Sequence, residues 1–147
     1  MSMSSKTMTT KLFMKKNNIK SILMTAYDVD PYKGGESQIG WKIPFSLSKD
    51  FNIILVTRRN NSENIFKYVK ENNINTDQIK FLFYDLPYIL RFWKRGARGS
   101  GIYFYLWQMF MPLYLYLNKV DFDVAHSVNF VSDSYPHFLW ITGKPSI

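Results

Sequence analysis

Short apolar runs alternate with longer amphipathic stretches along most of the chain. Four of these runs are rich in Ile, Leu, Val and Phe, have polar residues around them, and lie at positions 20–27, 52–57, 79–85 and 122–128. Runs of this kind are typical of parallel strands that are buried on both faces. The stretch KPSI, at 144–147, resembles the first residues of a fifth strand.

Helical periodicity occupies the intervals between the apolar runs. A four-residue apolar repeat predicts a helix over 37–48, which Pro44 should kink or loosen because proline has no backbone N–H to donate. A second helix is expected over 61–73, with Asn61 or Ser62 as its N-cap. Two further helices are expected at 102–117 and 133–141.

Strands that alternate with helices predict an α/β protein. Right-handed crossovers would give a Rossmann-like open parallel sheet with helices on both faces. Residues 1–17 are polar and basic and lack the apolar core of a signal peptide, so we expect a mobile tail there. Residues 18–147 have the length of one domain.

Composition narrows the set of partners and sites. Of 147 residues, 46% are hydrophobic, and the net charge of +8 favours an anionic partner such as a phosphorylated ligand, an acidic membrane surface or nucleic acid. The absence of cysteine excludes disulfide scaffolds and cysteine-based zinc sites. The two histidines are far apart and have no acidic ligand pattern, so no metal site is expected.

Ligands of an open α/β sheet bind at the carboxyl ends of its strands. After the first expected strand come Gly34, Gly35 and Glu36, which match neither a dinucleotide fingerprint nor a P-loop. Two interpretations remain open. The glycine pair could let backbone N–H groups approach an anion, or it could be only a tight turn from strand to helix.

The other strand ends carry polar side chains as well. Arg58 and Asn60 follow the second strand, where an arginine could contact a phosphate or a sugar or could simply be solvated. His126 closes the fourth strand shortly before Asn129. A histidine in this place is either a structural residue whose hydrogen bonds are made within the fold or a member of the functional site.

A basic and aromatic stretch precedes the third expected helix. Its candidate membrane-contact residues are Arg91, Trp93, Lys94, Arg95 and Arg98. The uncharged run that follows is too short and too polar for a membrane span. The stretch is therefore either a basic loop before a buried helix or a surface that dips into an anionic membrane interface. No RNA-binding signature accompanies it, so we expect no nucleic-acid partner.

Four segments in order carry a likeness to a known family. They are ILMTAYDVDPYKGGESQIGW, VTRRNN, FYDLPYILRFWKRGARGSGIYFYLWQ and DFDVAHSVNFVSDSYPHFLW. Together they resemble the N-terminal domain of family 4 glycosyltransferases, which are retaining enzymes with two Rossmann domains, the GT-B architecture. The likeness spans most of residues 22–147.

The resemblance implies the acceptor side of an interdomain cleft. The nucleotide-sugar donor would be a substrate bound mainly by a C-terminal domain, before which this chain would be truncated, and no cofactor or obligatory metal is implied. His126 would match the catalytic histidine near the transferred sugar. The remaining positions would bind the donor diphosphate or the acceptor, and they are Gly34, Gly35, Glu36, Arg58, Asn60 and Asn129.

The resemblance further implies a cytoplasmic location, peripheral to the inner face of the membrane, and a glycan or lipid-linked acceptor. We expect the isolated chain to be inactive. A non-catalytic binding or membrane-peripheral module derived from this domain is the alternative. A dinucleotide-binding oxidoreductase is disfavoured, because VTRRNN has no acidic residue for the ribose.

Overall fold

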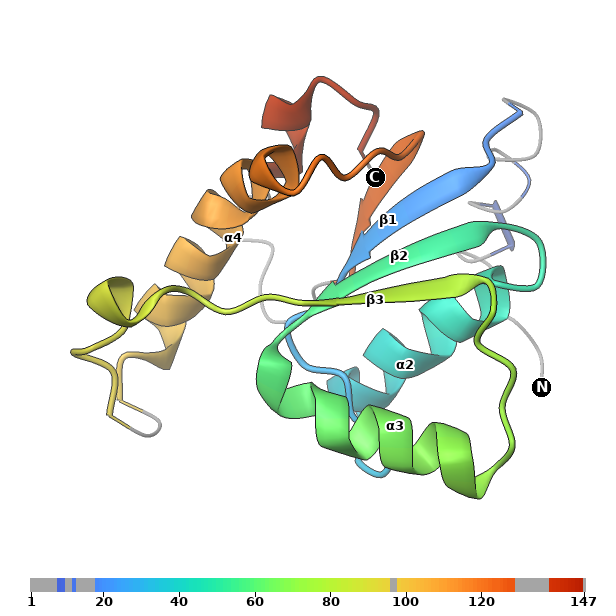
Figure 1. Ribbon diagram of the computed structural model, residues 1–147, viewed down its shortest axis with the longest axis horizontal. Helices are drawn as coiled ribbons and strands as arrows, with labels where there is room; N and C mark the ends of the chain where they lie inside the picture. Colours follow the sequence, from blue (N-terminus) through green and yellow to red (C-terminus); the bar gives the residue numbers. More distant parts are fainter. Residues whose placement is uncertain (1–7, 10–11, 13–17, 96–97, 129–137, 147) are drawn as a thin grey trace.

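The computed structural model describes residues 8–9, 12, 18–95, 98–128 and 138–146 (Figure 1). Its centre is a sheet of four strands, β1 (Ser21–Thr25), β2 (Asn52–Thr57), β3 (Ile79–Phe83) and β4 (Val124–Ser127). The order across the sheet is β3-β2-β1-β4, and every neighbouring pair is parallel. The predicted α/β class with a Rossmann-like open parallel sheet is therefore confirmed.

Three α-helices cover the two faces of the sheet (Figure 1). They are α2 (Glu36–Leu47), α3 (Ser62–Glu71) and α4 (Ser100–Leu117). Three short 3-10 helices accompany them, η1 (Arg59–Asn61), η2 (Tyr88–Leu90) and η3 (Phe138–Thr142). The prediction of helices on both faces is confirmed, since α2 and α3 lie on one face and α4 on the other.

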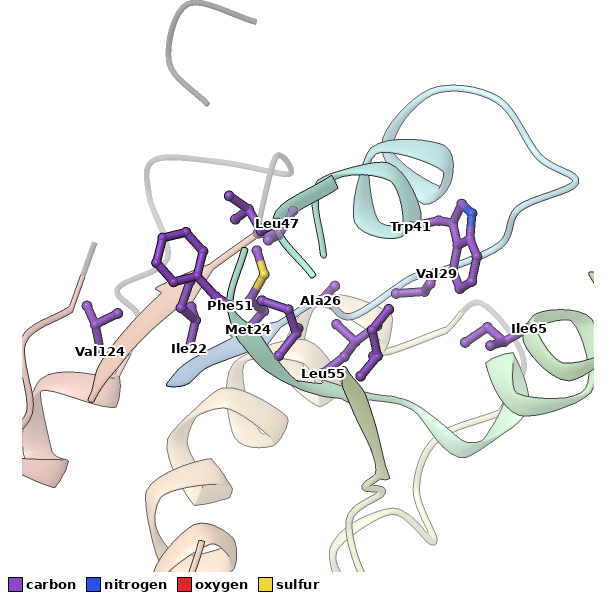
Figure 2. Packing of buried hydrophobic residues seen from close by; sticks show 13 residues of the cluster. Ile22, Met24, Ala26, Val29, Trp41, Leu47, Phe51, Leu55, Ile65 and Val124 are labelled. Atoms are coloured by element: carbon purple, nitrogen blue, oxygen red, sulfur yellow. The ribbon is translucent and has the colours of Figure 1, made fainter. Parts of the chain in front are cut away.

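Alternation along the strands produces a separate apolar core on each face. In β1, Ile22 and Met24 point into the core beneath α2 and α3, while Leu23 points towards α4. Figure 2 shows the first core, where Trp41 of α2 and Ile65 of α3 approach the sheet. Burial on both faces explains why each strand is a nearly continuous apolar run in the sequence.

The fourth strand is shorter than the sequence predicted, because Asp123 has another role. Its Oδ2 accepts hydrogen bonds from the backbone N–H groups of Lys20 and Ser21, both at 2.8 Å. These two bonds hold the start of β1 against the residue that precedes β4. They also lower the pKa of the Asp123 carboxyl from its usual value.

The fifth predicted strand is present only as a single bridge. Ser146 forms an isolated parallel bridge with Ala125, and the Ala125 N–H donates to the Pro145 carbonyl at 2.8 Å. The short helix predicted over 133–141 lies partly outside the described residues. Its described part is helical but belongs to the 3-10 helix η3.

Two helix details concern the expectations for Pro44 and for the N-cap of α3. Helix α2 continues through Pro44, whose carbonyl accepts from the Ser48 N–H at 2.9 Å. Neither Asn61 nor Ser62 caps α3 with its side chain. Asn61 is instead buried, and its Nδ2 donates to the Tyr27 carbonyl at 3.1 Å and to Thr57 Oγ1 at 2.7 Å, which ties the ends of β1 and β2 together. The tail predicted at 1–17 lies almost entirely outside the described residues.

Candidate functional site

A pocket of about 550 Å³ lies beyond the carboxyl ends of β2 and β3. Its volume falls within the range of roughly 300–1,000 Å³ that is usual for small-molecule sites. Figure 1 shows η2 and the first turns of α4 on this side of the sheet. The lining residues are Arg58, Asn60, Asp85, Tyr88, Arg91, Phe92, Lys94 and Tyr103.

Arg58 is held in the pocket by two neighbours. Its guanidinium carbon lies 4.4 Å from the centre of the Tyr27 ring, and its Nε donates to Asn60 Oδ1 at 3.0 Å. Tyr27 in turn packs edge-on against Phe104 and Trp107. Because one face of the guanidinium is stacked and one N–H is bonded, the other donors of Arg58 are positioned before any ligand arrives.

Asp85 and Tyr103 form the polar centre of the pocket. The Tyr103 hydroxyl donates to Asp85 Oδ1 at 3.1 Å and accepts from the Leu86 N–H at 3.3 Å. Burial and the adjacent Asp85 charge raise the pKa of Tyr103 to about 12. The phenol therefore remains protonated at neutral pH and keeps the carboxylate in one orientation.

The pocket carries an excess of positive charge. Three of its lining residues are cations and one is a carboxylate. The Lys94 ammonium lies 4.3 Å from the centre of the Tyr103 ring. Burial lowers the pKa of Lys94, and the neighbouring Arg58 charge acts in the same direction, while Asp85 opposes them. The cations thus repel one another, and a bound anion would relieve that repulsion.

The basic and aromatic stretch divides into an inward and an outward part. Trp93 is half-buried and covers Gly99, where a Cβ would lie 2.6 Å from the indole ring. Arg95 and Arg98 are exposed and form an antiparallel bridge, in which the Arg98 N–H donates to the Arg95 carbonyl at 3.0 Å. Trp93 therefore packs against the domain.

Exposed apolar side chains border the pocket on its η2 side. Tyr88 is 73% exposed, Ile89 78% and Phe92 65%, and Arg91 lies next to them in the chain. Of the membrane-contact candidates, Arg91 and Lys94 are also pocket residues. No helix within the described ranges is both long and apolar enough to cross a membrane.

The glycine loop lies away from this pocket. Gly34, Gly35 and Glu36 are exposed and are not among its lining residues. Gly35 has a φ of 65°, which favours glycine, and it immediately precedes α2. The loop before it packs on α3, where Tyr32 contacts the Tyr68 ring edge-on.

Asp30 organises the glycine loop from within. It is buried and accepts from the Tyr32 N–H at 3.0 Å and from Asn64 Nδ2 of α3 at 2.8 Å, and Lys33 lies 3.3 Å away. Burial alone would raise the pKa of Asp30, but these hydrogen bonds and the Lys33 charge outweigh it, and the pKa is lowered. The loop conformation thus depends on an ionised Asp30.

His126 lies on the other side of the sheet from Tyr103. It pairs with Met24 in register, and its neighbours Val124 and Val128 belong to the core beneath α2 and α3. Its Nδ1 is buried and has no hydrogen-bond partner among the described residues, and burial lowers its pKa. Asn129 lies outside the described residues.

The structure therefore brings together only part of the predicted site. Arg58 and Asn60 meet Arg91 and Lys94, which the sequence had placed in a separate membrane-contact group. Tyr103 and Tyr27 were missed because nothing in their local pattern distinguishes them from core aromatics, whereas Phe92 lies in the basic and aromatic stretch but was not chosen as a site residue. Asp85 had a positional signal, since it directly follows the third apolar run.

Comparisons with known proteins assign neither a family nor a function to this chain. No family model, no curated protein and no solved structure matches this chain. Within the described residues there is also no group of three or more His, Asp or Glu side chains placed to hold a metal ion. Functional inference therefore depends on the pocket and on the residues that form it.

Proposed function

We propose that this chain is the acceptor-side domain of a retaining glycosyltransferase, which moves a sugar from a nucleotide-sugar donor to a glycan or lipid-linked acceptor. The observation that carries the proposal is the pocket at the carboxyl ends of β2 and β3. It combines a carboxylate, cations and aromatic faces. This combination suits a sugar, because carboxylates accept hydroxyl hydrogen bonds and aromatic rings pack on the apolar faces of the pyranose.

The position of the pocket agrees with this role. In open α/β sheets the ligand lies outside the carboxyl ends of the strands, where loops from several crossovers converge. Here the segment after β2 contributes Arg58 and Asn60, the segment after β3 contributes Asp85, and α4 contributes Tyr103. Each side chain would contact an acceptor from a different direction, which fixes the orientation of the acceptor hydroxyl that receives the sugar.

The chemistry requires a second binding surface for the donor. Departure of a nucleoside diphosphate from an oxocarbenium-like transition state is assisted by cations and N–H donors aimed at the phosphates. We propose that a C-terminal Rossmann domain supplies most of these donors. On this side of the cleft, the exposed glycine pair before α2 and His126 at the end of β4 are the proposed contributions.

A transfer assay tests this function. The isolated chain and a protein extended through the natural reading frame beyond Ile147 are incubated with radiolabelled sugar nucleotides and with glycan and isoprenyl-linked acceptors. We expect product only from the extended protein, and a loss of at least tenfold in transfer for Asp85→Asn. Glu63→Gln, an exposed position on α3, is the matched control and should leave transfer unchanged. Turnover by the isolated chain would contradict the proposal.

A second candidate function is a non-catalytic, membrane-peripheral module. The exposed Ile89 and Phe92 next to Arg91 favour it, because apolar and cationic side chains together bind anionic interfaces. Sedimentation with anionic liposomes separates the two functions. A variant with Arg91, Lys94, Arg95 and Arg98 all changed to Ser should lose binding in the membrane module. Unchanged liposome binding by this variant would contradict a role of these four residues in membrane contact.

A further inference from the structure

We infer that the pocket binds its acceptor through a phosphate group, which Arg58, Arg91 and Lys94 hold while Asp85 accepts a hydroxyl of the same ligand. This inference rests on the proposed function and specifies the class of acceptor, namely a phosphorylated or diphosphate-linked sugar. The charge of the pocket, the geometry of its donors and the separate place of its carboxylate all suit such a ligand.

The charge of the pocket matches a phosphate. Three cations and one carboxylate line it, which leaves an excess of two positive charges. A phosphate monoester carries about −1.5 to −2 at neutral pH, so it would balance this excess. A carboxylate ligand would leave about one charge unbalanced, and a neutral sugar would leave both.

The three cations are free to bind an anion. In the described part of the chain, none of them has a carboxylate within ion-pairing distance, although exposed lysines elsewhere do, such as Lys33 and Lys144. Arg58 and Lys94 are each held over an aromatic ring, at 4.4 Å and 4.3 Å. Burial lowers the pKa of Lys94, and the charges of Arg58 and Arg91 act in the same direction while Asp85 opposes them, which agrees with cations that lie near one another.

The donor geometry of arginine favours phosphate as well. A guanidinium offers paired N–H donors that match two phosphate oxygens. The Arg58 Nε donates to Asn60 and the guanidinium lies over the Tyr27 ring, so the side chain is held in place as a wall of the pocket. Arg91 is exposed and also lines the pocket, so its guanidinium adds a second set of paired donors.

Asp85 has a different partner in the ligand. Its Oδ1 accepts from Tyr103, and no described residue donates to its Oδ2. A carboxylate repels a phosphate but accepts strongly from a sugar hydroxyl. A ligand with both groups, separated by part of a sugar ring, satisfies the cations and the carboxylate at the same time.

Isothermal titration calorimetry on the purified chain tests the inference with glucose 1-phosphate, inorganic phosphate and glucose as probes. We expect glucose 1-phosphate to bind more tightly than either fragment and glucose to bind at least tenfold more weakly. A second arm uses phosphatidylcholine vesicles with and without an isoprenyl diphosphate, which distinguishes a lipid-linked phosphate from a soluble one. Equal affinity for glucose and glucose 1-phosphate would overturn the inference.

The variants locate the binding in this pocket. Arg58→Gln, Arg91→Gln and Lys94→Gln should each lower the affinity for glucose 1-phosphate about tenfold, as expected for loss of a charge-assisted hydrogen bond. Arg59→Gln is the matched control, because Arg59 is exposed, adjacent to Arg58 in the chain and not among the pocket residues. Its affinity should change less than twofold. An equal loss in Arg59→Gln would reduce the effect to general electrostatics and overturn the inference.

Asp85→Asn gives a test of opposite sign in two probes. Removal of the carboxylate charge should strengthen the binding of inorganic phosphate, because a repulsion is lost. It should weaken the binding of glucose 1-phosphate, because the acceptor for the sugar hydroxyl is lost. A change in the same direction for both probes would contradict the role of Asp85. Tighter binding of a single-stranded oligonucleotide than of glucose 1-phosphate, lost in Arg58→Gln, would assign the pocket to nucleic acid.

The two levels of the proposal can fail separately. If the pocket variants lose phosphate binding but the extended protein transfers no sugar, the glycosyltransferase function is wrong and the phosphate site remains. If transfer occurs with the same acceptor KM in Arg58→Gln and wild type, the phosphate site is wrong and the transferase function remains. Thermal unfolding of each variant shows whether a loss of binding reflects misfolding. A variant that misfolds is replaced by a more conservative one, Arg58→Lys or Lys94→Arg.

Discussion

The Tyr103 hydroxyl donates a hydrogen bond of 3.1 Å to Asp85 Oδ1 and accepts one of 3.3 Å from the Leu86 N–H. One phenol from α4 thus holds both the carboxylate and the backbone of the loop that follows β3. Since Lys94 also lies over the Tyr103 ring, this side chain connects the loop, the helix and the basic stretch. The shape of the pocket depends on it.

Tyr103→Phe should destabilise the domain and release Asp85. Loss of two hydrogen bonds at a buried position is expected to lower the free energy of unfolding by about 1–3 kcal/mol. Urea denaturation followed by tryptophan fluorescence measures the change. Tyr116→Phe, an exposed position on the same helix, should change it by less than about 0.5 kcal/mol. Equal stability of the two variants would show that the Tyr103 bonds contribute nothing.

Gly40→Ala should be destabilising although alanine is the better helix former. A Cβ at Gly40 would lie 2.6 Å from the Asp28 carbonyl oxygen, so the helix and the loop before it would have to separate. We expect a loss of about 1–3 kcal/mol from overpacking. Gly34→Ala is the control, because nothing lies within 4 Å of its added Cβ. A stabilising effect of Gly40→Ala would contradict the close packing of α2.

Asp30→Ala should loosen the glycine loop without changing the pocket. The substitution removes the acceptor for the Tyr32 N–H and for Asn64, at an expected cost of about 2–3 kcal/mol. The lowered pKa of Asp30 means that its contribution is complete above the usual aspartate pKa of 3.8 and is lost as the pH falls through the lower folded value. Hydrogen exchange should show faster exchange at Tyr32 and Lys33. Unchanged exchange there would contradict the role of Asp30.

The half-buried His126, whose Nδ1 is buried, predicts a dependence of stability on mildly acidic pH. Because burial lowers the folded pKa below the ordinary value of 6.5, the neutral ring is favoured in the folded state. Its contribution is complete above 6.5 and decreases as the pH falls from 6.5 to the folded pKa, where the unfolded chain binds the additional proton. Thermal unfolding of wild type should show this loss over that window, and His126→Gln should show less of it. If the stability of the two proteins fell equally with decreasing pH, His126 would be solvated in the folded state.

Much of the fold was predictable because it depends on local patterns. Apolar runs buried on both faces identified all four strands, and Asn52–Thr57 was predicted to the residue. The errors have identifiable tertiary causes. Asn61 was expected to cap α3 but bonds to Tyr27 and Thr57. Phe122 was expected to begin the fourth strand, but Asp123 binds the N–H groups at the start of β1.

The candidate site was only half predictable. Sequence reasoning placed Arg58 and Asn60 at a strand end, because parallel strands bring their carboxyl ends to one edge of the sheet, but it did not select Asp85 at the end of the next strand. It also favoured the glycine loop, since a glycine pair before a helix has the local character of an anion site. In the structure a hydrogen bond between Asp30 and Asn64 holds that loop against α3, and its residues do not line the pocket.

The sequence by itself determined the strands, the helices, the parallel arrangement and the positive charge, because each follows from periodicity or composition. Only the tertiary structure decided which polar residues meet. Tyr103 reaches Asp85 because α4 packs across the face of the sheet opposite α2 and α3, and Lys94 lies over the ring of the same tyrosine. Contacts between residues in different elements depend on the packing of those elements, and no local pattern encodes that packing.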